Sequence, residues 1–205
     1  MKRIESVKNF RLNSTKRATQ LCAETASLFM EIRQPNCDYI IIPRHSSENR
    51  RYVPFGFINK NIIVNDAVQI LPDATIYHFG ILTSNVHMAW MRTVAGRLKS
   101  DYRYSINIVY NNFVWPTPTD KQKSLIEKTA QGILDARALY PDSSFADLYD
   151  ETVMPSELRK AHQLNDRAVM EAYGFDKKIS ETECVAELMR LYQEKIVLVE
   201  MGIPK

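Results

Sequence analysis

The stretch HFGILTSNVHMAWMRTVAGRLKSDYRYSINIVYNNFVWP, residues 78–116, decides the fold of this chain. Its first half repeats apolar side chains at helical spacing, which predicts one helix over residues 79–94 with a buried face. Gly96 is expected to end that helix, because glycine readily adopts the left-handed conformation found just past a helix C-terminus. The predicted buried face consists of Leu82, Val86, Ala89, Trp90 and Val94.

The second half of the stretch predicts a polar loop held between this helix and a strand. Ile106 and Ile108 alternate along the chain, as in a half-buried strand, and Pro116 ends the unit. The intervening residues 97–104, RLKSDYRY, are mostly charged or polar. A polar loop mounted on two packed elements is typical of a surface that recognises a partner.

The residues before this stretch predict strands mixed with a helix. Residues 1–13 are basic and weakly patterned, which is typical of a strand or a linker. A helix is expected from Ser14 or Thr15, both good N-caps, to about Phe29. Short apolar runs rich in β-branched residues and bounded by Pro, Asn or Asp predict extended segments at 38–42, 52–57, 61–64 and 68–71.

After Pro118 the pattern becomes helical, and capping residues mark where the helices begin and end. The predicted elements are a helix capped by Thr119 and Gln122, a helical turn at 144–149, a helix from Pro155 to Gly174, and a helix capped by Ser180 and Glu183. The sequence therefore predicts an α+β fold, with strands and helices packed together over residues 1–116 and an all-α domain over residues 117–205.

Composition places the chain among soluble globular proteins, with 45% hydrophobic and 25% charged residues. No run of eighteen apolar residues is present, and the basic N-terminus lacks the apolar segment of a signal peptide, so we expect no membrane association. The cysteines, Cys22, Cys37 and Cys184, are odd in number and scattered. They predict a reducing, cytoplasmic location and neither a disulfide framework nor a zinc site.

Charge is distributed unevenly along the chain. Residues 1–116 carry 15 Lys and Arg against 8 Asp and Glu, whereas residues 117–205 carry 12 against 16. A basic front and an acidic back favour a polyanion as the partner of the front part. An ordinary solvated surface is the alternative explanation of the same imbalance.

No catalytic centre is visible in the sequence. The chain contains no phosphate-binding glycine loop, nucleophile elbow, zinc-protease pair or Cys-x-x-Cys motif. His78 and His87 are predicted to pack or cap the central helix. Glu157, His162 and Asp166 fall on a charge-rich helix, where a solvated face is the favoured interpretation over acid–base catalysis. We therefore predict no catalytic residue and no metal site.

The polar loop suggests base reading. Lys99 and Asp101 lie two residues apart in a run expected to be extended, so both side chains should point to one side, together with Arg103. A lysine can donate to the major-groove acceptors of guanine, and an aspartate can accept from the paired cytosine. The alternative is a surface ion pair of little energetic value. Four further arginines are candidates for phosphate contacts or are simply solvated: Arg44, Arg50, Arg51 and Arg97.

Ordered motifs then carry a family resemblance over nearly the whole chain. The chain resembles the C-terminal part of the MmeI-like type IIL restriction–modification enzymes, which comprises a target recognition domain and a helical C-terminal domain. The motifs are Pro43-Arg44 with Ser46-Ser47-Glu48, Tyr52-Val53-Pro54, His78 to Ser84, Met88-Ala89-Trp90, Gly96 to Lys99, Tyr102 to Ser105, Tyr110 to Phe113, Trp115-Pro116, Ile133 to Arg137, Leu148-Tyr149-Asp150, Ala161-His162, Asp166 to Val169 and Tyr173-Gly174.

The resemblance implies sequence-specific recognition of double-stranded DNA. The family's base-reading pair falls in the loop after Gly96-Arg97-Leu98, which here gives Lys99 and Asp101 and favours a G·C pair. The resemblance also places specificity positions near Asn65 and Asp66, and at Arg103. It makes residues 1–116 the DNA target recognition domain and residues 117–205 the helical C-terminal domain.

The resemblance further implies partners that this chain lacks. In the family, one chain also carries a nuclease domain, a connector and an adenine-methylating domain that uses S-adenosylmethionine; their motifs are absent here. We therefore expect no cofactor in this chain, no methylation by it alone, and docking to the methyltransferase domain of the same enzyme. The chain begins with Met1 and is expected to be a fragment or a split gene product. The alternative function is a protein-interaction scaffold with incidental DNA affinity; a small stand-alone enzyme is less well supported.

Overall fold

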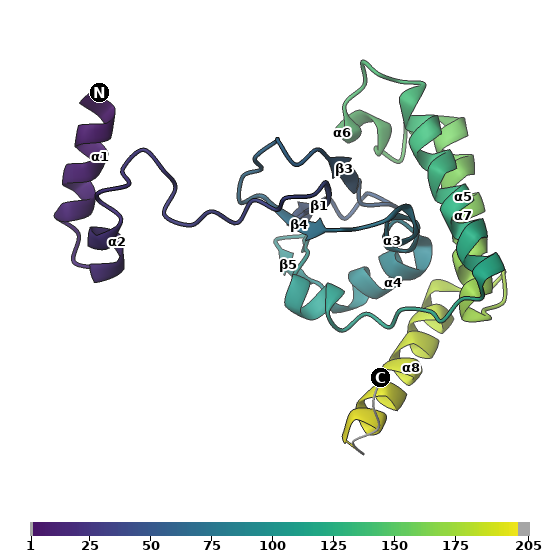
Figure 1. Ribbon diagram of the computed structural model, residues 1–205. Coiled ribbons are helices and arrows are strands. Elements are labelled where there is room, and N and C mark those ends of the chain that lie inside the picture. The colour runs from purple at the N-terminus through teal and green to yellow at the C-terminus, as the bar shows by residue number, and fades with distance from the viewer. Residues whose placement is uncertain (1, 201–205) are drawn as a thin grey trace. The chain divides into compact units, whose positions relative to one another are not determined.

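The computed structural model describes residues 2–200 and divides the chain into two compact units, residues 1–36 and 37–205 (Figure 1). The first unit contains α1 (Lys2–Leu12) and α2 (Arg17–Leu21). The predictions of a strand or linker over residues 1–13 and of a helix reaching Phe29 were therefore wrong. The second helix ends early because the Arg11 guanidinium binds the backbone carbonyls of the following turn, at Cys22, Thr25 and Leu28.

The second unit contains two small antiparallel sheets. In the first, β1 (Tyr39–Pro43) lies between β3 (Gly56–Ile58) and β4 (Val68–Pro72). In the second, β6 (Asp101–Arg103) lies between β2 (His45–Ser46) and β5 (Gly96–Leu98). The strands predicted at 38–42 and 68–71 are thus confirmed within one residue.

Two other segments that were predicted to be extended differ in the structure. Of residues 52–57, only Gly56 and Phe57 enter a strand, and residues 61–64 form none. Ile62 and Ile63 are exposed, so their apolar character does not report a buried strand. The backbone there turns instead: Ile62 N–H donates to Asn59 O, and the Tyr39 hydroxyl donates to Ile62 O.

The predicted helix over residues 79–94 is two helices, α3 (Ile76–Leu82) and α4 (Asn85–Val94). Thr83 and Ser84 break it, because their hydroxyls donate to carbonyls of α3 at 2.7 Å and Ser84 Oγ also caps α4. His78 closes a capping box with Thr75 at the start of α3, as its predicted capping role requires. Gly96 does not cap α4; Ala95, in an extended conformation, ends the helix and Gly96 begins β5.

The strand predicted around Ile106 is instead a π-helix, η1 (Ile106–Tyr110). The Trp90 indole N–H donates to Val109 O at 2.9 Å, and the Asn112 side-chain amide donates to the carbonyls of Asn107 and Ile108. These bonds satisfy carbonyls that a strand would have offered to a neighbouring strand. Long-range partners therefore override the local alternation of apolar residues.

The helical C-terminal region matches its prediction, and the α+β class with it. It contains α5 (Asp120–Ala138), α6 (Phe145–Leu148), α7 (Ser156–Tyr173) and α8 (Glu181–Glu200). Thr119 with Gln122 and Ser180 with Glu183 form the expected capping boxes, and Gly174 ends α7 with a left-handed φ of 71°. In Figure 1, α5 and α7 lie side by side, and α8 packs on α4.

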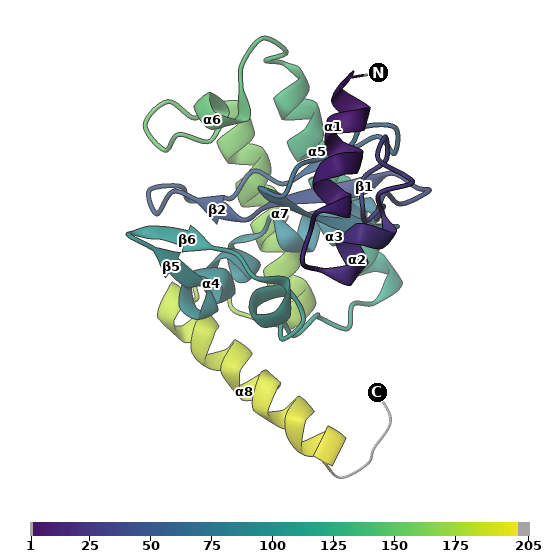
Figure 2. The ribbon, with the colours of Figure 1, turned by 90° about the vertical axis from the view of Figure 1, so that its left-hand side faces the viewer.

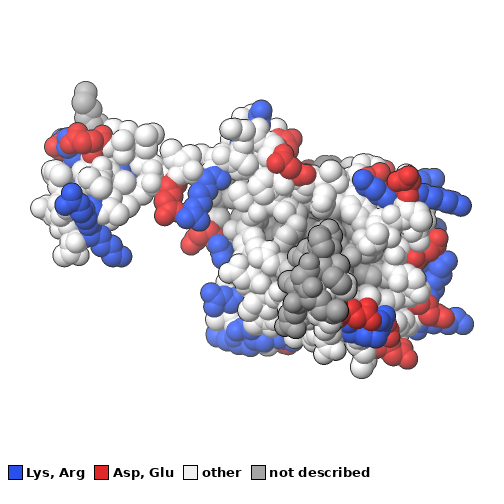
Figure 3. Space-filling model, turned by 60° about the horizontal axis from the view of Figure 1, so that its bottom comes forward, with Lys and Arg blue, Asp and Glu red and all other residues white. Residues whose placement is uncertain are grey.

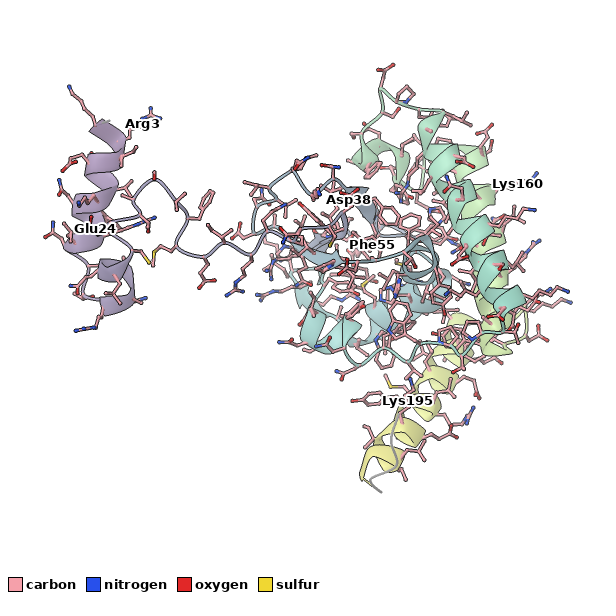
Figure 4. All side chains as sticks on the ribbon, viewed as in Figure 1. Arg3, Glu24, Asp38, Phe55, Lys160 and Lys195 are labelled. Atoms are coloured by element: carbon pink, nitrogen blue, oxygen red, sulfur yellow. The ribbon has the colours of Figure 1, made fainter. Side chains whose placement is uncertain are left out.

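One hydrophobic core runs through the second unit, and residues on both sides of position 116 contribute to it. Phe55 lies at its centre, fully buried between the first sheet and the helices (Figure 4). Lys160 on α7, in contrast, points away from the core in the same view. Gly80 lets α3 approach α5 closely, because an added Cβ would lie 2.7 Å from Ile126 Cγ2.

Candidate nucleic-acid interface

The β5–β6 hairpin carries the predicted base-reading residues. Leu98 pairs with Asp101, so Lys99 and Ser100 form a two-residue turn, and Lys99 has a left-handed φ of 56°. The expectation that Lys99 and Asp101 belong to one extended run was therefore wrong. Both side chains are nevertheless exposed, Lys99 in the turn and Asp101 at the start of β6. The β5–β6 hairpin that carries them can be followed in Figure 2.

The two faces of β6 have different environments. Asp101 and Arg103 point to the exposed face, and Tyr102 points to the other and is buried. The Arg97 guanidinium lies over the Tyr102 ring, 3.8 Å from its centroid, and donates to Ser100 O at 2.7 Å. Arg97, a predicted phosphate contact, is therefore engaged in holding the hairpin together and lies on the face opposite Asp101.

A hydrogen bond from a neighbouring loop orients Asp101. The backbone N–H of Glu48 donates to Asp101 Oδ1 at 3.3 Å. That bond occupies part of one carboxylate oxygen and leaves Oδ2 and the remaining lone pair of Oδ1 as acceptors. The carboxylate is thus positioned by main chain while still able to accept from a ligand.

Arg103 has neighbours that sequence reasoning missed. In the second sheet it pairs with His45 on one side and with Gly96 on the other. Cross-strand partners share a face, so His45 and Arg103 are exposed side by side, with no side chain at Gly96 to crowd them. The pairing joins residues far apart in sequence, which is why the pattern of a two-residue strand gave no signal for His45.

Arg44 joins the two sheets through its main chain. Its N–H donates to Ala67 O at 2.9 Å, and its carbonyl accepts from Tyr104 N–H at 2.8 Å. These bonds bring the turn that contains Asn65 and Asp66 next to the end of β6. Asn65 Oδ1 accepts from Ala67 N–H at 3.0 Å, which stabilises that turn.

Six predicted DNA-contacting residues therefore gather at one end of the second unit, all of them exposed: Lys99, Asp101, Arg103, Asn65, Asp66 and Arg44. In the view of Figure 3, Lys and Arg side chains collect at the lower left of this unit, whereas on its right they mix with Asp and Glu.

Arg50 and Arg51 do not join this group by any contact. They line a cavity of about 400 Å³ together with the carboxylate residues Glu48, Glu151 and Glu181. The pKa of Asp150 is lowered, mainly by hydrogen bonds from Thr152 and in smaller part by the charge of Arg50. Carboxylates therefore lie near both arginines.

A buried polar network links the loop after β2 to α7. The Tyr52 hydroxyl donates to Asp166 Oδ2 at 2.6 Å, and Asn85 N–H donates to Asp166 Oδ1 at 2.7 Å. The Tyr52 ring also stacks on His162, with centroids 4.1 Å apart. The predicted solvated positions of His162 and Asp166 were wrong, since both are buried. His162, Asn165 and Asp166 fall within the apolar stripe of α7, and this signal could have revealed their burial.

Arg137 completes the network. It donates to Phe55 O at 2.7 Å and to the Tyr149 hydroxyl, which lies 2.8 Å from His162 Nε2. Burial lowers the pKa of His162 well below its usual value, and Arg137 adds to that effect. Burial also raises the pKa of Asp166 to about 6, although hydrogen bonds from Tyr52 and Asn85 oppose the shift.

Among residues 2–200, His, Cys, Asp and Glu side chains do not come together in the groups of three that would hold a metal ion. No helix within those residues is long and apolar enough to cross a bilayer.

The fold is that of a target recognition domain followed by a helical C-terminal domain. The chain belongs to the MmeI target recognition domain family: the model of that domain matches residues 1–117, and the model of the MmeI C-terminal domain matches residues 118–200. The family predicted from the sequence motifs is confirmed.

Two relatives show the extent of the similarity. DNA methyltransferase A of Bacillus subtilis (strain 168) is 39% identical over 192 residues, which cover 94% of this chain and 22% of the relative. The solved structure of the type IIL restriction–modification enzyme MmeI in complex with DNA is 46% identical, with a TM-score of 0.88 over 95% of this chain and 26% of that one. The chain thus spans about a quarter of the length of these relatives.

Proposed function

We propose that this chain is the sequence-reading part of a restriction–modification DNA methyltransferase and that it binds double-stranded DNA through the β5–β6 hairpin. One observation carries the proposal: the Asp101 carboxylate is exposed, and a main-chain N–H orients it. Arg103 and His45 lie on the same face of the sheet as Asp101. The family membership and the DNA complex of the similar MmeI structure support it.

In the proposed mode of binding, the side chains at the tip of the hairpin enter the major groove. The Lys99 ammonium donates to O6 and N7 of a guanine, and Asp101 accepts from N4 of the paired cytosine. Arg103, Asn65 and Asp66 contact the neighbouring base pairs. Arg44 and the lysines and arginines around it contact phosphates, which contributes affinity but no sequence preference.

The chemistry is assigned to the remainder of the enzyme. We propose that a methyltransferase domain outside this chain binds S-adenosylmethionine and methylates an adenine that is flipped out of the bound duplex. This chain supplies no catalytic group and binds no cofactor in the proposal; it fixes which adenine is presented. Its place of action is the cytoplasm, where the DNA and the reduced cysteines both belong.

A selection from randomised duplexes tests the proposal. Wild-type chain is expected to enrich one short sequence that contains an invariant G·C pair, and Asp101→Ala is expected to enrich the same sequence with that pair relaxed. The loss of discrimination at this pair should be about 1–3 kcal/mol. Arg44→Ala should weaken binding to every duplex and reduce its salt dependence. Enrichment of no sequence by the wild-type chain, or equal weakening on all sequences by Asp101→Ala, would refute base reading by the hairpin.

A further inference from the structure

The first unit exposes an unusual amount of apolar surface. Phe10 is 76% exposed, Phe29 is 73% exposed and Leu21 is 72% exposed. Other large apolar side chains of the same unit are also exposed: Ile4, Val7, Leu12, Leu28, Met30 and Ile32. Exposed apolar side chains at this density mark a surface that binds another molecule.

This unit has almost no hydrophobic core of its own. Among the described residues up to position 36, Ala23 is the buried hydrophobic residue and Arg11 the buried charged one. Arg11 organises the unit by donating to three carbonyls, at Cys22, Thr25 and Leu28, over distances of 2.7–2.9 Å. Three hydrogen bonds of this kind cannot replace a hydrophobic core. A segment below about 40 residues therefore needs a partner to become stable.

The exposed apolar residues are arranged for docking. Ile4, Val7 and Phe10 recur every three residues along α1, so they lie along one side of that helix. Phe29 and Leu28 follow the turn that Arg11 fixes against the same helix. We call the surface formed by Ile4, Val7, Phe10, Leu21, Leu28 and Phe29 the N-terminal apolar surface.

We propose that the N-terminal apolar surface docks on the part of the restriction–modification methyltransferase that lies outside this chain. The inference rests on the proposed function. About three quarters of each relative's length lies outside the matched region, so a protein surface large enough to cover these residues belongs to the same enzyme. Residues 2–34 carry seven Lys and Arg against three Asp and Glu, so the partner surface has an apolar centre and an acidic rim.

Two other occupants fit less well. DNA would match the positive charge of residues 2–34, but it offers no surface that buries two phenylalanines and several aliphatic side chains at once. The second unit packs most of its large apolar side chains into its own core, although some, such as Leu139 and Leu164, are exposed. Both occupants remain outcomes that the experiment distinguishes.

Calorimetric titration tests the docking directly. The probe is DNA methyltransferase A of Bacillus subtilis, produced without the segment that matches this chain. The full wild-type chain is expected to bind it, and the double variant Phe10→Ala/Phe29→Ala is expected to bind at least tenfold more weakly. The matched control is Leu139→Ala/Leu164→Ala, which removes two exposed leucines of the second unit and should bind as the wild type does. Absence of wild-type binding, or equal binding by all three chains, would overturn the proposal.

Hydrogen exchange gives a second readout that does not depend on the variants. Amides of residues 2–28 should exchange rapidly in the isolated chain and become protected when the probe is added. Strong protection in the isolated chain at low concentration would show that the second unit covers the surface, and protection that grows with chain concentration would show a second copy. Either result would overturn the proposal.

DNA binding separates this inference from the proposed function. The Phe10→Ala/Phe29→Ala chain should retain the wild-type affinity and sequence preference for duplex DNA. A loss of DNA affinity in this variant would identify DNA as the occupant and overturn the docking proposal. Absence of DNA binding by the wild-type chain, in contrast, would count against the proposed function and leave the protein-docking result to stand on the titration.

Discussion

The Tyr52 hydroxyl donates a 2.6 Å hydrogen bond to the buried Asp166 carboxylate, across 114 positions of sequence. Tyr52 lies in the same loop as Glu48, whose N–H orients Asp101, and Asp166 lies on α7. A carboxylate of the helical region thus fixes the loop that positions the hairpin. The two family domains are therefore coupled through a buried polar contact as well as through apolar packing.

Replacing Asp166 should destabilise the fold. Asp166→Ala leaves the Tyr52 hydroxyl and the Asn85 N–H buried without an acceptor, so the free energy of unfolding should fall by about 2–4 kcal/mol. Urea denaturation measures the change. Arg167→Ala, the exposed neighbour on α7, is the control and should change stability by less than about 0.5 kcal/mol. Equal effects of the two substitutions would contradict the buried acceptor role.

The same carboxyl should make stability depend on pH. Burial raises the pKa of Asp166 to about 6 from 3.8, so the folded state holds a proton that the unfolded state has released between these values. The contribution of Asp166 to stability is therefore present below pH 3.8 and is lost as pH rises to 6, by about 2–3 kcal/mol. The difference in unfolding free energy between wild type and Asp166→Asn should fall over that window and stay flat above pH 7. A constant difference across the whole range would disprove the shift.

Buried His87 should make stability rise with pH, in the opposite direction to Asp166. Burial lowers the pKa of His87 to about 3, although a hydrogen bond with the Leu82 carbonyl opposes the shift. The unfolded state therefore binds a proton below pH 6.5 that folded His87 does not bind, and this penalty disappears as pH rises to 6.5. At pH 5 the penalty should be about 2 kcal/mol. His87→Gln should show a correspondingly shallower rise in stability between pH 5 and 7; an unchanged slope would show that His87 is protonated in the fold.

Two glycines in helices should respond to alanine with opposite signs. Gly80→Ala places a Cβ 2.7 Å from Ile126 Cγ2 and 3.0 Å from Ala130 Cβ, which forces α3 and α5 apart and should cost about 1–3 kcal/mol. Gly132→Ala meets nothing within 4 Å and should stabilise α5 by about 0.5–1 kcal/mol. Thermal unfolding of the pair checks the contrast, and a stabilising Gly80→Ala would disprove the close helix approach.

Two substitutions of Lys99 should distinguish its effect on backbone strain in the hairpin from its effect on base reading. Its left-handed φ of 56° is unfavourable for a residue with a Cβ, so Lys99→Gly should stabilise the fold by up to about 1 kcal/mol while it abolishes the guanine preference. Lys99→Ala should lose the same preference without the gain in stability. Parallel duplex selection and urea denaturation measure the two effects. Retention of the guanine preference by Lys99→Gly would remove Lys99 from the reading group.

The predictions that succeeded were local in origin. Thr119 with Gln122, Ser180 with Glu183 and Gly174 act on backbone groups within one helical turn, so their spacing alone identifies them. The predictions that failed depended on distant partners. The Trp90 indole binds the Val109 carbonyl and helps convert an expected strand into η1, and no pattern within residues 106–110 encodes that bond.

The candidate site was likewise predictable only in its local features. The types of residue in the hairpin suggested base reading, but their geometry comes from segments elsewhere in the chain. Glu48 N–H orients Asp101 from 53 positions away, and His45 becomes a neighbour of Arg103 only through the pairing of β2 with β6. Arg97 looked equivalent to the other arginines until the structure placed it on the Tyr102 face.

The junction at Arg44 has a consequence for how such a protein acquires a new target. Both bonds that tie the two sheets together there, to Ala67 and from Tyr104, use only peptide groups. Every residue type except proline supplies both peptide groups at position 44, because proline alone lacks the N–H. Natural variation or protein engineering can thus exchange the side chain at this point while the two sheets stay joined.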